Sequence, residues 1–162
     1  MWNLPVVFLC ENNEYGISLN VRDQQRIEHV ADRAVSYCMP SRIVDGNNVL
    51  EVFDAVSLAV AAARRGEGPT LIECKTYRTT GHYEGDSQSY RPKEEVEAWK
   101  RRDPINAFEA YLLTNDIATS ADIEGIKGEI AVICKTAVEY GRSSPFPSTR
   151  DAYDDVYAPL LV

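Results

Sequence analysis

Three short apolar runs alternate with two segments of helical spacing in the first 75 residues, and this order constrains the fold most strongly. Residues 5–10 (PVVFLC) are apolar and rich in β-branched and aromatic side chains, which predicts a strand buried on both faces. Residues 27–38 and 49–65 carry apolar side chains at helical spacing, while residues 42–46 and 69–75 are predicted strands. The order strand, helix, strand, helix, strand predicts an α/β fold: a parallel sheet with flanking helices.

The second half of the chain has a different pattern. Residues 76–92 (TYRTTGHYEGDSQSYRP) lack hydrophobic periodicity, which predicts a long polar loop. Three helical patterns follow, at residues 93–101, 105–113 and 120–140. Ser120 is the expected N-cap of the last of these helices, and the Pro-rich tail from residue 142 is expected to be extended.

We expect one domain over residues 1–162. Its first part, residues 1–91, would form the sheet portion with an active-site loop at residues 76–91. Its second part, residues 92–162, would form a helical C-terminal segment with an extended tail.

Charge and hydropathy exclude two classes of function. The net charge is −8, which leaves no basic face for general nucleic-acid binding. The most apolar helical stretch, residues 56–63, is far shorter than the roughly 20 residues of a membrane span. The start of the chain lacks the pattern of a secretory signal, so we expect a cytoplasmic protein without nucleic-acid or membrane partners.

Four cysteines are widely spaced and form no Cys-x-x-Cys pair: Cys10, Cys38, Cys74 and Cys134. Two lie in predicted strands and two in predicted helices. We therefore expect scattered, buried free thiols in a reducing compartment.

Two polar segments begin at the carboxyl ends of predicted parallel strands, at residues 11–18 and 76–91. Parallel strands point the same way, so both segments should emerge at one edge of the sheet, where open α/β sheets bind ligands. The amide oxygen of Asn13 and the carbonyl of Tyr15 are hard oxygen ligands suited to Mg²⁺. A simple turn explains the same residues, because Asn and Gly favour turns.

Three side chains of the polar loop are candidates for function. His82, between glycine-containing turns and near acids, is able to donate to a phosphate or move protons. It is equally compatible with an exposed loop residue that has no role. Arg91 suits a carboxylate or phosphate, or else an ion pair with Asp86 that fixes the loop.

Several segments together resemble a known family. "LPVVFLCENNEYGIS", "VDGNNVLEVFDAV", "GEGPTLIECKTYRTTGHYEGDSQSYR" and "RRDPINAF" follow one another here. In this order they resemble the α subunit of thiamine-diphosphate-dependent 2-oxo acid dehydrogenase E1 components, which act on pyruvate, branched-chain 2-oxo acids or acetoin. The resemblance runs over nearly the whole chain.

The resemblance implies roles for individual residues. Asn13 would bind Mg²⁺ through its side chain and Tyr15 through its backbone carbonyl, with Gly16 completing this part of the thiamine diphosphate motif. His82 would contact the cofactor near its diphosphate and assist acyl transfer to a lipoyl group. The positions of Asp86, Tyr90 and Arg91 resemble residues that order the loop.

The resemblance also implies partners. An E1 β subunit would complete the active site, and the lipoyl domain of an E2 protein would accept the acyl group. The Gly-Asp-Gly that begins the family's cofactor motif does not precede Asn12 and Asn13 in this sequence. We therefore expect the C-terminal half of an α subunit, with an incomplete thiamine-diphosphate-binding fold. A further chain that carries the N-terminal half is an additional candidate partner.

Two alternatives stay open. Another thiamine diphosphate enzyme, such as a transketolase-like one, shares part of the motif. A non-catalytic module that only assembles with a partner chain is a second possibility, since the cofactor motif is incomplete in this sequence.

Overall fold

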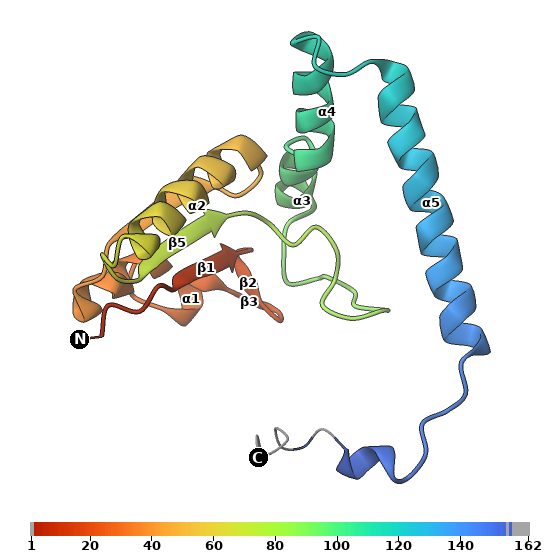
Figure 1. The fold of residues 1–162 in the computed structure, drawn as a ribbon, viewed down its shortest axis with the longest axis horizontal. Coiled ribbons are helices and arrows are strands. Elements are labelled where there is room, and N and C mark those ends of the chain that lie inside the picture. Colours follow the sequence, from red (N-terminus) through yellow and green to blue (C-terminus); the bar gives the residue numbers. More distant parts are fainter. Residues whose placement is uncertain (1, 155, 157–162) are drawn as a thin grey trace. The chain divides into compact units, whose positions relative to one another are not determined.

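The computed structural model describes residues 2–154 and 156 (Figure 1). The chain groups into two compact units, Met1–Asn115 and Asp116–Val162, each treated by itself below. The single domain expected over residues 1–162 stays a prediction.

A three-stranded parallel sheet forms the centre of the first unit. Its order is β1 (Val7–Asn12), β5 (Thr70–Lys75) and β4 (Ser41–Asp45). Asn12 and Asp45 both lie opposite Lys75, so all three strands end at one edge. The predicted α/β class with a parallel sheet is confirmed.

β5 is the buried strand and β1 is an edge strand. Ile72, Glu73 and Cys74 of β5 are all buried. In β1, Phe8 is 50% exposed and Leu9 45% exposed. The prediction that residues 5–10 are buried on both faces is therefore wrong, because β1 pairs with β5 along one side and the described residues leave part of its apolar surface uncovered.

Helix α2 (Val49–Arg64) packs on the sheet through alanines. Asn48 caps it by accepting a hydrogen bond from the Glu51 backbone N–H, as expected for an Asn N-cap. Its buried residues are Ala55, Ala59 and Ala63, and the core below them consists of Val44, Ile72 and Cys74. Val52 and Val56 of the apolar side chains also pack against this core, whereas Val49 and Phe53 are exposed. Small side chains let the helix approach the strands closely.

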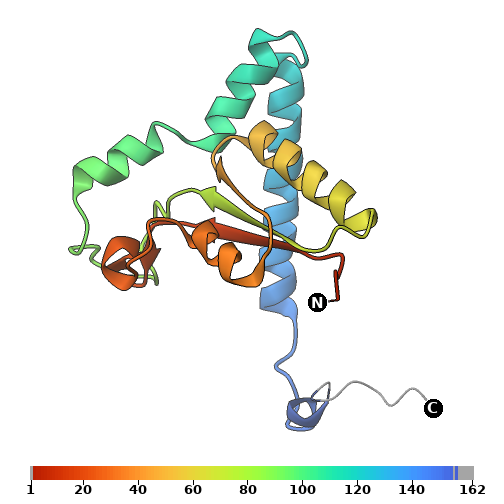
Figure 2. The ribbon, with the colours of Figure 1, turned by 90° about the vertical axis from the view of Figure 1, so that its left-hand side faces the viewer.

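The opposite face of the sheet is covered by η1 (Val30–Tyr37). Side chains alternate along a strand, so Glu73 points away from Ile72 and Cys74, and it contacts the backbone N–H of Ala31 in η1. Figure 2 shows α2 and η1 on different sides of the strands. An α-helix over residues 27–38 was expected; a 3₁₀ helix forms instead. It ends at Cys38 with φ 51°, shortly before Pro40.

Short elements follow β1 in the polar segment of the chain. β2 (Tyr15–Gly16) pairs antiparallel with β3 (Leu19–Asn20), and α1 (Val21–Gln24) follows directly. Elements of two to four residues are too short to show a period, so the sequence pattern did not indicate them.

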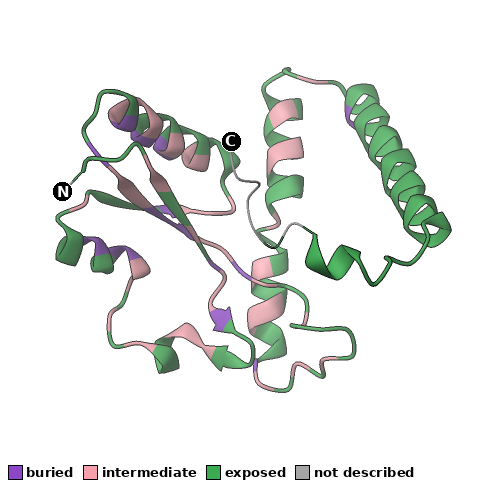
Figure 3. Ribbon diagram, turned by 60° about the horizontal axis from the view of Figure 1, so that its bottom comes forward, coloured by how far each residue is buried: buried purple, intermediate pink, exposed green. Residues whose placement is uncertain are grey.

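The predicted helical segment is confirmed. Its elements are α3 (Lys93–Lys100), α4 (Pro104–Thr114) and, in the second unit, α5 (Ser120–Ser143) and η2 (Asp151–Tyr153). Thr119, not Ser120, caps α5, because its hydroxyl accepts from the Asp122 N–H while the Asp122 carboxylate accepts from the Thr119 N–H. Figure 3 shows α5 exposed along nearly all of its length. The tail predicted as extended contains η2, and its residues 155 and 157–162 lie outside the described residues.

The four cysteines are free, as expected. Cys74 is buried and Cys10 is partly buried, whereas Cys38 and Cys134 are exposed, so the expectation of buried thiols is wrong for the latter two. Within residues 2–154 and 156, no helix is long and apolar enough to cross a membrane.

Candidate functional site

The two polar segments meet at the carboxyl edge of the sheet, as predicted. The backbone N–H of Thr76 donates to the carbonyl of Asn12 over 3.0 Å, and that of Arg78 donates to the carbonyl of Asn13 over 3.3 Å. These bonds continue the β1–β5 pairing beyond the strands, and they hold the start of the loop at residues 76–91 beside the Asn12-Asn13 turn.

The Asn12-Asn13 segment is a turn stabilised by its own side chains. Asn12 Oδ1 accepts from the Glu14 N–H over 3.2 Å, and Asn13 Oδ1 accepts from the Tyr15 N–H over 3.1 Å. Glu14 has φ 70°, in the left-handed region. The turn interpretation of these residues is thus correct for the backbone. It does not exclude a ligand, because an amide oxygen has a second lone pair.

A buried carboxylate lies directly behind this turn. Glu73 is fully buried, and its Oε1 accepts from Asn12 Nδ2 and lies 2.7 Å from Lys75 Nζ. Its Oε2 accepts from the Ala31 N–H over 2.8 Å. Burial alone would raise the pKa of Glu73, but the hydrogen bonds from Asn12, Lys75 and Ala31 outweigh it and hold that pKa below its ordinary value. The carboxylate therefore stays ionised.

Tyr15 connects the turn to helix α3. Its hydroxyl donates to Glu95 Oε1 over 3.0 Å, and the hydroxyl of Tyr77 donates to the same oxygen over 2.7 Å. Burial, together with the hydrogen bond to Glu95, raises the pKa of Tyr77 well above its ordinary value. The rings of Tyr15 and Tyr77 meet edge to face, and Tyr77 stacks on Trp99. This aromatic group and the hydrogen bond to Glu95 hold the Tyr15 side chain in place.

Arg91 binds the backbone of the loop from inside. Its guanidinium donates to the carbonyls of Arg78, Thr79 and Thr80 and to the side chain of Gln88. Three tyrosine rings surround it, with centroids 5.3 to 5.9 Å from Cζ: Tyr15, Tyr77 and Tyr90. Arg91 is buried. It thus holds the loop through carbonyls rather than through the ion pair with Asp86 that was the alternative.

Asp86 closes the outer part of the loop. Its carboxylate accepts from the backbone N–H groups of His82 and Gln88 and from the Tyr90 hydroxyl. The first of these bonds contributes most to lowering the pKa of Asp86. Gly81 is required here, because a Cβ would lie 2.6 Å from Asp86 Cβ. The loop positions predicted from sequence are thus in contact with one another.

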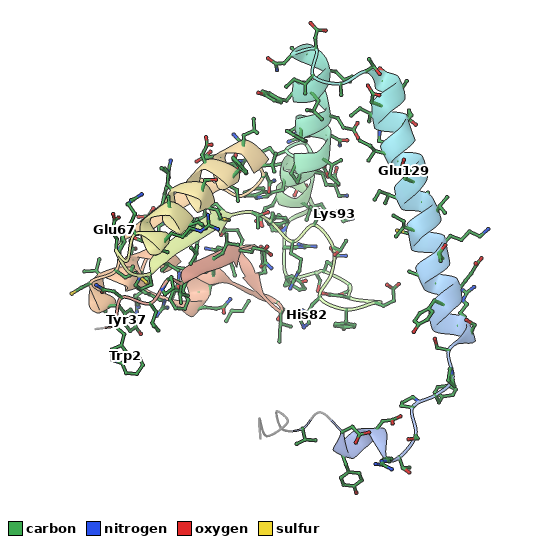
Figure 4. The ribbon with its side chains drawn as sticks, in the orientation of Figure 1. Trp2, Tyr37, Glu67, His82, Lys93 and Glu129 are labelled. Atoms are coloured by element: carbon green, nitrogen blue, oxygen red, sulfur yellow. The ribbon has the colours of Figure 1, made fainter. Side chains whose placement is uncertain are left out.

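His82 is exposed at the outer part of the loop, beyond the strand ends (Figure 4). Its Nδ1 lies 3.5 Å from a terminal nitrogen of Arg78. The Arg78 guanidinium also donates to the carbonyl of Ile17 and to the Tyr90 hydroxyl. Sequence reasoning missed Arg78, although a basic residue three positions after a strand end was the available signal. Arg78 therefore joins the β2–β3 hairpin, His82 and the loop-ordering residues.

The donor set near the turn fits part of a magnesium site. Asn13 and the Tyr15 carbonyl supply two neutral hard oxygens, and Mg²⁺ takes further oxygens from carboxylate, water or phosphate. In the part of the chain that the structure describes, no three His, Cys, Asp or Glu side chains are grouped to hold a metal. The residues present therefore suit a cation that a phosphate ligand also coordinates.

Comparison with known proteins identifies the family. The sequence model of the Dehydrogenase E1 component family matches residues 1–150. The chain belongs to this dehydrogenase E1 family. It is 41% identical over 158 residues to the α subunit of the acetoin:2,6-dichlorophenolindophenol oxidoreductase of Bacillus subtilis, covering 97% of the chain and 47% of the relative.

Other E1 relatives are named for different substrates. The 2-oxoisovalerate dehydrogenase α subunit of Bacillus subtilis is 43% identical over 156 residues, which are 96% of the chain and 47% of that protein. The pyruvate dehydrogenase E1 α subunit of Porphyra purpurea is 37% identical over 148 residues, which are 91% of the chain and 43% of that protein. The chain thus spans about half the length of the curated relatives it matches.

Proposed function

We propose that the chain forms part of a thiamine-diphosphate-dependent E1 dehydrogenase. The enzyme would decarboxylate a 2-oxo acid or cleave acetoin and transfer the acyl group to lipoamide of an E2 protein. One observation carries the proposal: the Asn13 turn and the His82 loop meet at the carboxyl edge of the sheet through backbone hydrogen bonds. This is where a parallel α/β sheet binds its ligand, and the chain belongs to the E1 family.

In this proposal, Asn13 and the Tyr15 carbonyl would hold Mg²⁺, and Gly16 lies beside them. The bound cofactor supplies the carbanion chemistry. The protein supplies position: Asn13 is held by its turn, Tyr15 by Glu95, and the loop by Arg91. An ordered turn loses little conformational freedom when a ligand binds.

His82 is the proposed acid–base residue of the chain. Its backbone is fixed by Asp86 and its ring lies beside Arg78, so the imidazole is presented at a defined point of the loop. Since His82 is exposed, it is able to donate to a diphosphate oxygen or to an incoming lipoyl group. Asp86, Tyr90 and Arg91 order the loop around it.

The proposed partners are an E1 β subunit and the lipoyl domain of E2. A cytoplasmic location belongs to the same proposal. Affinity purification of the tagged chain from its own cells, with added thiamine diphosphate and Mg²⁺, tests it. The purified complex should reduce an artificial electron acceptor with pyruvate, a branched-chain 2-oxo acid or acetoin, and only with the cofactor.

Two variants make the test specific when acyl transfer to an added lipoyl domain is measured beside reduction of the artificial acceptor. His82→Ala should lower this acyl transfer by about 100-fold or more, while Tyr83→Ala, at an exposed neighbouring position, should have little effect. A complex inactive with all three substrates would contradict the proposal. A cofactor-free dimer of the chain would support the non-catalytic module, and sugar ketol transfer would support the transketolase-like alternative.

A further inference from the structure

Glu73 is an unusual residue for the centre of a sheet. It lies in the middle strand with no exposed surface, between the buried residues Ile72 and Cys74. A buried carboxylate is costly unless its charge is paired and both oxygens are hydrogen-bonded. Lys75 pairs with it at 2.7 Å, and hydrogen bonds occupy both oxygens. Replacement of a buried ion pair by well-packed apolar side chains is often neutral or stabilising. Stability alone therefore does not explain why this position carries a carboxylate.

One contact leads directly to the candidate cation site. Asn12 Nδ2 donates to Glu73 Oε1 over 2.7 Å, and both residues are buried. This bond fixes the orientation of the Asn12 amide, because the flipped amide would place its oxygen against the carboxylate. The fixed Oδ1 then accepts from the Glu14 N–H. The carboxylate thus determines the first hydrogen bond of the turn.

Asn13, the candidate cation ligand, lies between Asn12 and Glu14 in the turn. The Glu14 backbone is held at φ 70°, a conformation that costs a non-glycine residue free energy and needs compensating contacts. With Glu14 fixed, Asn13 Oδ1 accepts from the Tyr15 N–H. The hydrogen bonds run from Glu73 through Asn12 to Glu14, and they define where the Asn13 amide oxygen and the Tyr15 backbone lie.

We propose that Glu73 is a positioning residue for the cation and cofactor site, which it orders by holding the Asn12 amide. What the site binds rests on the proposed function; the ordering of the turn does not. Glu73 touches no candidate ligand and acts through Asn12. Its second oxygen anchors Ala31 at the start of η1, so one carboxylate fixes both the turn and the helix on that face.

Replacement of the ion pair by apolar side chains separates positioning from stability. In the double variant Glu73→Met/Lys75→Met, the core keeps side chains of similar length, and such replacements of buried ion pairs are often neutral or stabilising. The replacement also leaves the Asn12 amide and the Ala31 N–H without their acceptor, which offsets this gain, so we expect the melting temperature to change little. Amide hydrogen exchange at Glu14 and Tyr15 should nevertheless become faster by about tenfold or more, because the Asn12 amide loses its acceptor.

The single variant Glu73→Gln gives the complementary result. Lys75 and Asn12 both approach Oε1, so the glutamine oxygen should take that place and its NH₂ group should face the Ala31 N–H. Exchange should then increase at Ala31 and not at Glu14 or Tyr15. The matched control is Glu97→Met/Lys100→Met, which removes an exposed ion pair of α3 and should leave the turn unchanged.

Unchanged exchange at Glu14 and Tyr15 in the double variant would overturn the proposal. A uniform increase through β1, β5 and α2 with a lower melting temperature would also overturn it, since Glu73 would then act on stability alone. If the double variant does not fold, the variant Asn12→Ala tests the proposal instead, because it removes the Asn12 amide and leaves the Glu73–Lys75 pair intact. It should speed exchange at Tyr15 to a similar extent, and unchanged exchange there would reject the proposal.

The exchange experiment needs neither cation nor cofactor, which separates this proposal from the proposed function. A second measurement joins them: in the purified complex, the double variant should bind thiamine diphosphate with Mg²⁺ about tenfold more weakly than the unmodified chain. If the unmodified complex shows no cofactor binding, the proposed function fails and the exchange result still stands. If exchange changes but affinity does not, the turn is ordered by Glu73 without consequence for binding, and the positioning role is rejected.

Discussion

At the scale of single residues, the candidate site depends on two buried charges with opposite tasks. The Glu73 carboxylate is satisfied by donors from three segments of chain, whereas the terminal nitrogens of the Arg91 guanidinium donate to acceptors in a single loop and its buried Nε has no partner among the described residues. Neither side chain has to contact a ligand to influence the structure of the site. The sequence drew attention to Arg91 because it follows Ser-Tyr at the end of the loop. Glu73 gave no such signal, because one acid in an apolar run has no partner until the fold is known.

The planar fork of Arg91 is central to the loop. In Arg91→Lys, an ammonium group cannot reach three carbonyls and the Gln88 side chain at once. We expect amide exchange and proteolytic cleavage within residues 78–88 to become faster by about tenfold or more. Arg64→Lys, at an exposed position of α2, is the control. Equal loop protection in both variants would show that Arg91 does not order the loop.

The lowered pKa of Glu73 has a consequence for stability. Folding favours the ionised form, so this contribution is fully present above the ordinary carboxyl value of 4.5 and is lost as the pH falls through the lower value of the folded protein. Urea unfolding between pH 7 and pH 2.5 should therefore show a loss of stability at acidic pH that is smaller in Glu73→Gln. Parallel pH curves for the two proteins would contradict this assignment.

At the scale of elements, periodicity predicted the strands and most helices well, and it failed where contacts between elements decide. The 16 residues of α2 were expected as a helix, and of its apolar side chains Val52 and Val56 pack on the core while Phe53 is exposed. Because α2 lies close to the sheet, only short side chains fit between them, and alanines of α2 therefore face the strands. Likewise, η1 is a 3₁₀ helix rather than the expected α-helix, and its start is tied to Glu73 through Ala31, a contact invisible in the sequence.

The alanine face of α2 makes a direct test. Ala59 is 5% exposed and belongs to the core cluster with Val44 and Ile72. Ala59→Leu should lower the free energy of unfolding by about 1–3 kcal/mol through overpacking. Ser57→Leu, on the exposed side of the same helix, should change it by less than about 0.5 kcal/mol. Chemical denaturation of both variants provides the comparison.

At the scale of the whole molecule, the predicted meeting of two polar segments at one sheet edge is confirmed, because strand direction alone requires it. The side-chain details were only partly predictable. The turn at Asn13 and the loop with His82, Asp86 and Tyr90 were recognisable. Glu95 and Glu73 connect them from positions that no local pattern marks, and Arg78 was marked only by its place shortly after a strand end. The roles of Asn13, Tyr15, Gly16 and His82 toward a cofactor stay predictions.

The ligand chemistry of the chain predicts how it behaves alone. Asn13 and the Tyr15 carbonyl offer Mg²⁺ two neutral oxygens and no carboxylate, so we expect the isolated chain to bind thiamine diphosphate with Mg²⁺ weakly or not at all. Calorimetry measures this directly, and the purified complex is the positive control. Micromolar affinity of the isolated chain would contradict the prediction.

Arg91 holds the loop through main-chain carbonyls, and these are the same for every amino acid. The path of the loop is therefore nearly independent of which side chains occupy positions 79 and 80, and the exposed positions 83 and 84 lie outside this support. Such a frame tolerates substitution without losing its shape. A library randomised at these four positions should therefore retain the fold of the loop.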